Sequence, residues 1–83
     1  MALFMDVHSL SGGVAMDDVA KAHQADLATQ GAYGVNYLRY WVDESKGQVF
    51  CLVEAPHADA ANTVHREAHG LVADSIYQVQ EGS

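Results

Sequence analysis

The chain has 83 residues, of which 49% are apolar, and eleven acidic residues oppose four basic ones for a formal charge of −7. This length predicts one domain over residues 1–83 with a thin core, and the composition excludes a disordered chain. Nucleic acid and anionic membranes are excluded as partners because both require clustered Lys and Arg, whereas the negative field attracts cations.

The first half of the chain predicts a strand, a helix and a second strand. Residues 2–8 alternate in character, as a strand does, and a turn with two glycines follows. Apolar residues recur at three and four positions over residues 15–30, which predicts a helix with Gly31 as its stop. Residues 33–42 are aromatic and β-branched, which favours a strand.

The second half predicts a similar succession. The polar turn 43–47 leads into residues 48–55, so that two strands make a hairpin. A helix is expected over residues 58–72, with Gly70 as an earlier alternative stop, and residues 75–80 predict a last strand. The order β-α-β-β-α-β predicts an α+β, ferredoxin-like sandwich in which two helices cover one face of an antiparallel sheet.

The apolar surplus exceeds what one thin core can bury. The only cysteine cannot form an intrachain disulfide, so a metal ion or a homodimer is the expected reinforcement. Four aromatic residues are expected in the core or in the dimer interface: Tyr33, Tyr37, Trp41 and Tyr77. The opening residues lack the basic region of a signal peptide and no apolar run could span a bilayer, which together with the single cysteine predicts a cytoplasmic protein.

The chain contains five histidines, and two of them lie in the second predicted helix. His65 and His69 stand at i and i+4, so both imidazoles lie on one helical face and can share a metal ion. The intervening Glu is not in the second place, which excludes the zinc-protease motif. The alternative is two solvated histidines, with His69 near the negative end of the helix dipole.

Asp6 and His8 form a second candidate site. Two residues apart in a strand, they point to the same face, where a carboxylate and an imidazole can share a metal ion or a hydrogen bond. A strand end that reaches solvent is the alternative. The predicted topology brings His8 toward His69, whereas His57 begins the second helix at the opposite edge of the sheet.

His23 and Cys51 each allow two interpretations. His23 lies on the apolar face of the first helix, between Val19 and Leu27, as a hydrogen-bonded core histidine or as a metal ligand. Asp6, Cys51 or a metal ion could satisfy it there. Cys51 is favoured as a small core hydrophobe, with thiolate ligation as the alternative. Imidazole and carboxylate donors suit nickel, zinc, copper or iron better than magnesium or calcium.

Five segments occur in a fixed order: FMDVH (4–8), AH (22–23), YLRYWVD (37–43), CLVEAP (51–56) and VHREAHGLVAD (64–74). In these segments, and over about residues 2–80, the chain resembles a family of small nickel-binding proteins known from actinobacteria. The resemblance implies a homodimer of ferredoxin-like subunits that binds several nickel ions for sequestration or detoxification. It also implies a metal role for five residues within the segments: Asp6, His8, His23, His65 and His69.

Three functions are compatible with these observations. The first is binding of nickel, zinc or another divalent transition metal, which predicts binding that weakens as pH falls through about 6.5. The second is a small dimeric enzyme, monooxygenase- or isomerase-like, that uses His23 or the Asp6–His8 pair as its acid–base group on a small organic molecule. A closed pocket lined by Tyr37, Trp41 and His8 would favour the enzyme. The third is a dimeric module that senses a ligand. Metal binding without catalysis is the preferred interpretation.

Overall fold

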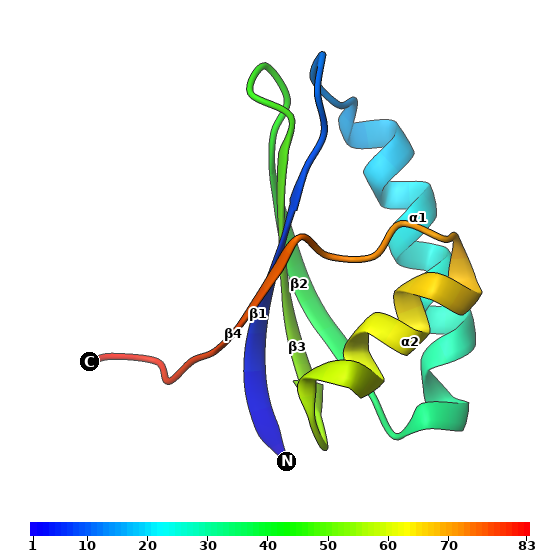
Figure 1. Cartoon of the computed structure of the whole chain (residues 1–83), viewed down its shortest axis with the longest axis vertical. Coiled ribbons are helices and arrows are strands. Elements are labelled where there is room, and N and C mark those ends of the chain that lie inside the picture. Colours follow the sequence, from blue (N-terminus) through cyan, green and yellow to red (C-terminus); the bar gives the residue numbers. More distant parts are fainter.

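A computed structural model describes all residues 1–83 (Figure 1). It contains four strands, two α-helices and one short 3-10 helix, η1. The bounds in chain order are β1 Ala2–Ser9, α1 Met16–Thr29, η1 Gln30–Tyr33, β2 Asn36–Asp43, β3 Gln48–Ala55, α2 Ala58–Ala68 and β4 Ser75–Gln78. The predicted α+β class is confirmed. Neither helix is long and apolar enough to cross a membrane.

The four strands form one antiparallel sheet in the order β2-β3-β1-β4. Both helices lie on the same face of this sheet and leave its other face bare (Figure 1). Central strand β1 pairs with β3 along its whole length, from Ala2 opposite Ala55 to Ser9 opposite Gln48. Because side chains alternate along a strand, every second residue of β1 points toward the helices.

The helices end differently from the prediction. Helix α2 ends at Ala68 rather than at residue 72, because Gly70 adopts φ 85°, a left-handed conformation that other residues avoid. Gly31 does not stop α1 but lies inside η1, and the chain turns at Gly34, where φ is 65°. Residues 33–35, predicted as strand, therefore precede β2.

The core lies between the helices and the inner face of the sheet. Val53, Ala61 and Val64 have no exposed surface. Tyr37 is the one predicted aromatic residue that joins this core, whereas the side chains of Tyr33, Trp41 and Tyr77 are exposed. The same layer also buries four polar residues, Asp6, His8, Asp26 and His65. Buried polar groups need partners, so these four mark the place to look for a site.

The uncovered side of the sheet, which we call the outer face, is largely apolar. Met5 lies opposite both Leu52 and Tyr77, and Phe50 lies opposite Trp41. Residues directly opposite each other in an antiparallel pair share a face. Trp41 is 47% exposed and Tyr77 is 56% exposed, so large aromatic surfaces meet the solvent here. The apolar residues of the outer face are Leu3, Met5, Val7, Trp41, Phe50, Leu52 and Tyr77. Two charged residues lie among them, Arg39 opposite Leu52 and Glu54 opposite Leu3.

Candidate metal centre

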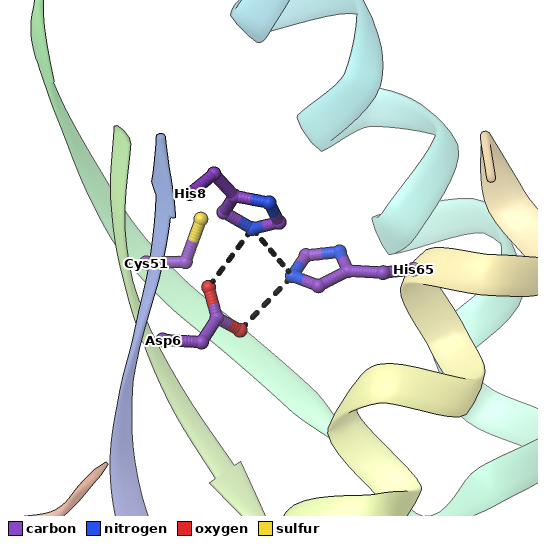
Figure 2. Close-up of side chains that lie close together, drawn as sticks. All are labelled: Asp6, His8, Cys51 and His65. Atoms are coloured by element: carbon purple, nitrogen blue, oxygen red, sulfur yellow. Dashed lines mark hydrogen bonds and ion pairs between the residues drawn. The ribbon is translucent and has the colours of Figure 1, made fainter. Parts of the chain in front are cut away.

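Four potential metal donors converge in the core between the sheet and α2 (Figure 2). Asp6 and His8 stand two apart on the inner face of β1, and Cys51 on β3 lies directly opposite Asp6. His65 reaches them from the buried face of α2. One donor atom from each residue lies within 4.8 Å of the donors of the other three. We call Asp6, His8, Cys51 and His65 the primary cluster.

The carboxylate of Asp6 is the centre of the primary cluster. Its Oδ1 lies 3.2 Å from His8 Nε2, and its Oδ2 lies 2.9 Å from His65 Nε2. The hydroxyl of Tyr37 donates to the same Oδ2 over 2.8 Å and also lies 2.7 Å from His65 Nε2. The two Nε2 atoms of His8 and His65 are only 3.3 Å apart. Two imidazole nitrogens, a carboxylate and a phenol thus surround one small volume.

His65 stands between two buried carboxylates. Its Nε2 faces Asp6, and its Nδ1 lies 3.0 Å from Asp26 Oδ1 on helix α1. Burial alone would lower the pKa of His65, but the hydrogen bonds and charges of Asp26 and Asp6 outweigh it and raise the pKa to about 9. In the metal-free protein at neutral pH, His65 is therefore an imidazolium that donates to both carboxylates.

The same buried surroundings shift the pKa values of Asp6, Cys51 and Tyr37. Burial would raise the pKa of Asp6, but its bonds to His65 and His8 and the charge of His65 hold that pKa below its usual range. Burial and the neighbouring Asp6 charge raise the pKa values of both the Cys51 thiol and the Tyr37 phenol. Metal-free Cys51 is therefore a neutral thiol, which would have to lose its proton to act as a ligand.

The donor set fits a divalent transition metal. Two imidazoles, a carboxylate and a thiolate suit nickel, zinc, copper or iron. Their donor atoms lie within 4.8 Å of one another, so small side-chain movements would bring all four to ordinary bond lengths of about 2.0–2.3 Å from one ion. Asp26 on the far nitrogen of His65 matches the carboxylate–histidine arrangement that orients metal-bound imidazoles.

The remaining predicted ligands lie beside this cluster. His69 does not belong to α2 but caps its end, and its Nε2 lies 3.0 Å from Asp26 Oδ1. The sequence placed His69 nearest to His8, whereas the structure brings His65 to that position. His23 stacks on Tyr40 with ring centroids 4.6 Å apart, and its buried Nδ1 has no hydrogen-bond partner.

His57 lies outside the cluster, as expected. Its Nδ1 accepts a hydrogen bond from the backbone N–H of Ala60 over 3.2 Å and so caps the start of α2. This histidine has a structural role that explains its position without a metal.

A cavity of about 80 Å³ lies between α1 and the sheet, beside the primary cluster. His8, His23 and His69 line it, and the exposed residues Asp18 and Leu71 show that it reaches the surface. Neither Tyr37 nor Trp41 lines it, although both were expected in an enzyme pocket. The cavity provides an entry path to donors that are otherwise buried.

Asp26 was not predicted as a site residue, although it hydrogen-bonds His65 and is only 2% exposed. A signal was available, because Val19, His23 and Asp26 stand at i, i+4 and i+7 on one helical face. The predicted face of α1 included Leu27 instead, and Leu27 is 37% exposed. Tyr37 was expected as an aromatic packing residue, and its hydroxyl contacts were not foreseen.

Comparisons with known proteins identify the family of this chain. A family model described as "Nickel responsive protein SCO4226-like" matches residues 4–79. The crystal structure of SCO4226 from Streptomyces coelicolor A3(2) is similar with a TM-score of 0.91 and 40% sequence identity, covering 99% of this chain and 100% of that one. No curated protein matches the chain. The resemblance to an actinobacterial nickel family is thus confirmed, and the chain belongs to the SCO4226-like family of nickel responsive proteins.

Proposed function

We propose that this protein binds nickel, or a similar divalent transition metal, at the primary cluster and sequesters it. The observation that carries the proposal is the convergence of four donor atoms from β1, β3 and α2 within 4.8 Å of one another. The net charge of −7 attracts cations to the molecule, and the nickel responsive family makes nickel the first ion to test. Zinc is the principal alternative.

The burial of the site supports holding an ion rather than transforming a substrate. Asp6, His8 and His65 are at most 7% exposed, so a bound ion would exchange only through the neighbouring cavity. We therefore propose binding without catalysis. An enzyme that used the Asp6–His8 pair would need a path by which an organic substrate reaches that pair. A ligand-sensing module would need a change of conformation or assembly when the ion binds.

Calorimetric titration of the purified protein with Ni²⁺ and Zn²⁺ at pH 7.5 tests the proposal. We expect binding far tighter than millimolar. His8→Ala and Cys51→Ser should each weaken it by at least about 100-fold, since the loss of an outer partner alone costs about 10–100-fold. His57→Asn, which removes a histidine outside the cluster and keeps a capping side chain, is the matched control. Equal affinities in all four proteins would refute the proposed site.

Sequestration also requires that the bound ion dissociates slowly. Nickel held in the core should leave slowly when the loaded protein is mixed with an excess of chelator. We expect Leu71→Ala, which trims the exposed part of the cavity wall, to speed release without changing the ligands. Release as fast as from a free hexahistidine peptide would argue against storage.

We also propose that the chain is a cytoplasmic homodimer of ferredoxin-like subunits, paired through the outer face. A second copy supplies an equally apolar surface, and the symmetric contact would cover Trp41 and Tyr77, which one chain leaves exposed. The bare side of the sheet in Figure 1 leaves room for such a partner. Cys51 is a free buried thiol, which suits a reducing compartment.

Sedimentation analysis tests the dimer. Trp41→Glu places a charge on the outer face, at the exposed aromatic residue of edge strand β2, and should give a monomer at concentrations where the unaltered protein is dimeric. Leu71→Glu changes an equally exposed apolar residue at the other side of the molecule and should leave the dimer intact. A monomeric unaltered protein, or equal effects of both variants, would exclude this interface.

A further inference from the structure

Tyr37 touches two members of the primary cluster, although it is not one of the four donors. It lies on β2, a strand that supplies no member of the cluster, and it is only 3% exposed. Its ring packs on the ring of His65, with centroids 4.6 Å apart. The core therefore holds the hydroxyl of Tyr37 in one place, beside the atoms that would bind an ion.

Three acceptor atoms compete for the proton of this hydroxyl. Asp6 Oδ2 lies 2.8 Å from the hydroxyl oxygen, His65 Nε2 lies 2.7 Å from it, and the carbonyl oxygen of Ala61 lies 3.2 Å from it. A hydroxyl carries a single proton to donate, so it serves one of the three acceptors at full strength. Which acceptor receives the proton depends on whether an ion is bound.

An ion in the primary cluster would remove His65 from this competition. A lone pair of Nε2 that is shared with a metal cannot also accept a proton. Asp6 Oδ2 then competes only with the carbonyl of Ala61, and the carboxylate is both nearer and charged. Hydrogen bonds to an ionised acceptor are roughly twice as strong as those between neutral groups. The proton of Tyr37 therefore stays on Asp6 Oδ2.

The other carboxylate oxygen of Asp6 faces the remaining donors. Oδ1 lies 3.2 Å from His8 Nε2, and that nitrogen lies 3.3 Å from His65 Nε2. A carboxylate with one oxygen held by a hydrogen bond presents its second oxygen to a metal. Hydrogen bonds of this kind orient metal-binding carboxylates in proteins.

We propose that Tyr37 is a positioning residue of the metal centre, whose hydroxyl holds Asp6 Oδ2 so that Asp6 binds the ion through Oδ1 alone. The inference rests on the proposed function, because Asp6 is a ligand only if an ion occupies the primary cluster. In the competing interpretation Tyr37 only packs, so that its ring against His65 matters and its hydroxyl does not.

A crystal structure of the nickel-loaded protein tests the arrangement directly. Asp6 Oδ1 should lie about 2.0–2.2 Å from the ion, whereas Oδ2 should lie clearly farther away and keep its hydrogen bond to Tyr37. Asp6 bound through both oxygens, through Oδ2, or not at all would overturn the positioning role and leave the proposed function standing. The absence of an ion from the primary cluster would overturn both.

Calorimetric titration with Ni²⁺ measures the contribution of the hydroxyl. Tyr37→Phe removes the hydroxyl and keeps the ring, and it should weaken binding about 10–100-fold, as the loss of a ligand's hydrogen-bond partner does. Tyr40→Phe is the matched control, because Tyr40 lies on the same strand and its ring stacks on His23 rather than on His65. Its affinity should be unchanged. An equal affinity of Tyr37→Phe and the unaltered protein would refute the proposal.

The same substitution in an Asp6→Asn background separates positioning from packing. A neutral amide accepts a weaker hydrogen bond than a carboxylate does, so Tyr37→Phe should cost clearly less affinity there than in the unaltered protein. The same loss in both backgrounds would show that Tyr37 acts by packing and would overturn the proposal. If Tyr37→Phe does not fold, the distances of Asp6 Oδ1 and Oδ2 from nickel in the unaltered protein still decide.

Discussion

On strand β1, the two faces of the sheet depart from the usual distribution of polar and apolar side chains. On β1, Asp6 and His8 point into the core, whereas Met5 and Val7 point to the bare outer face. Ordinary strands of an exposed sheet do the opposite. Each reversal is costly for an isolated chain, by desolvation inside and by exposed apolar area outside. The comparison teaches that the side chains of β1 suit the two partners proposed above, an ion on the inner face and a second chain on the outer face.

The largest loss of stability should come from removing Asp6, whose carboxylate is the centre of the primary cluster. Asp6→Ala deprives His65 and Tyr37 of their shared acceptor, and breaking a buried charged network costs about 3–5 kcal/mol. Urea unfolding of the metal-free protein measures the loss. Glu67→Ala, an exposed carboxylate on α2, should change stability by less than about 0.5 kcal/mol. A small effect at Asp6 would mean that its buried contacts with His65 and Tyr37 do not stabilise the protein.

The inner face should also make metal-free stability depend on pH. The pKa of His65 is raised from 6.5 to about 9, so its contribution is complete below pH 6.5 and is lost as pH rises through about 9. The loss should be on the order of 3 kcal/mol. The lowered pKa of Asp6 predicts a second decline as pH falls below its ordinary value of 3.8. Urea unfolding in chelator from about pH 2 to about pH 9.5 checks both, and a flat profile between pH 6.5 and 9 would contradict the first.

Truncation of neighbouring residues on β3 compares the two faces directly. Val53 has no exposed surface and points inward, so Val53→Ala should cost about 2 kcal/mol at any protein concentration. Leu52 points outward, so Leu52→Ala should cost less than about 1 kcal/mol in dilute protein and more in concentrated protein, where the proposed dimer buries it. Equal, concentration-independent losses would remove the distinction between the faces.

The smallest effect on stability is expected at His57, which caps the start of α2. His57→Ala should cost about 1 kcal/mol through loss of the helix cap, whereas His57→Asn should restore most of it. Thermal unfolding resolves the difference, and nickel affinity should be unchanged in both variants. A change in affinity would show that His57 contributes to the metal site.

Much of the site could be read from spacing, because local geometry dictates it. Two residues apart on a strand share a face, which placed Asp6 and His8 together, and one turn of helix brought His65 and His69 near each other, with ring centroids 5.1 Å apart. Asp26 and Tyr37 escaped detection. Their roles depend on contacts with residues 39 and 28 positions away in the chain, and no local pattern records such contacts.

The sequence by itself determined the α+β class, the alternation of β1 and the family, because these depend on local periodicity and on segments kept in order. The end of α2 was already ambiguous at that level, and the left-handed Gly70 decided it. Only the tertiary structure decided which histidine meets His8. The pairing of β1 with β3 and the packing of α2 place His65, not His69, opposite Asp6. That choice is made by the packing of distant segments, which alone brings the donors within reach of one ion.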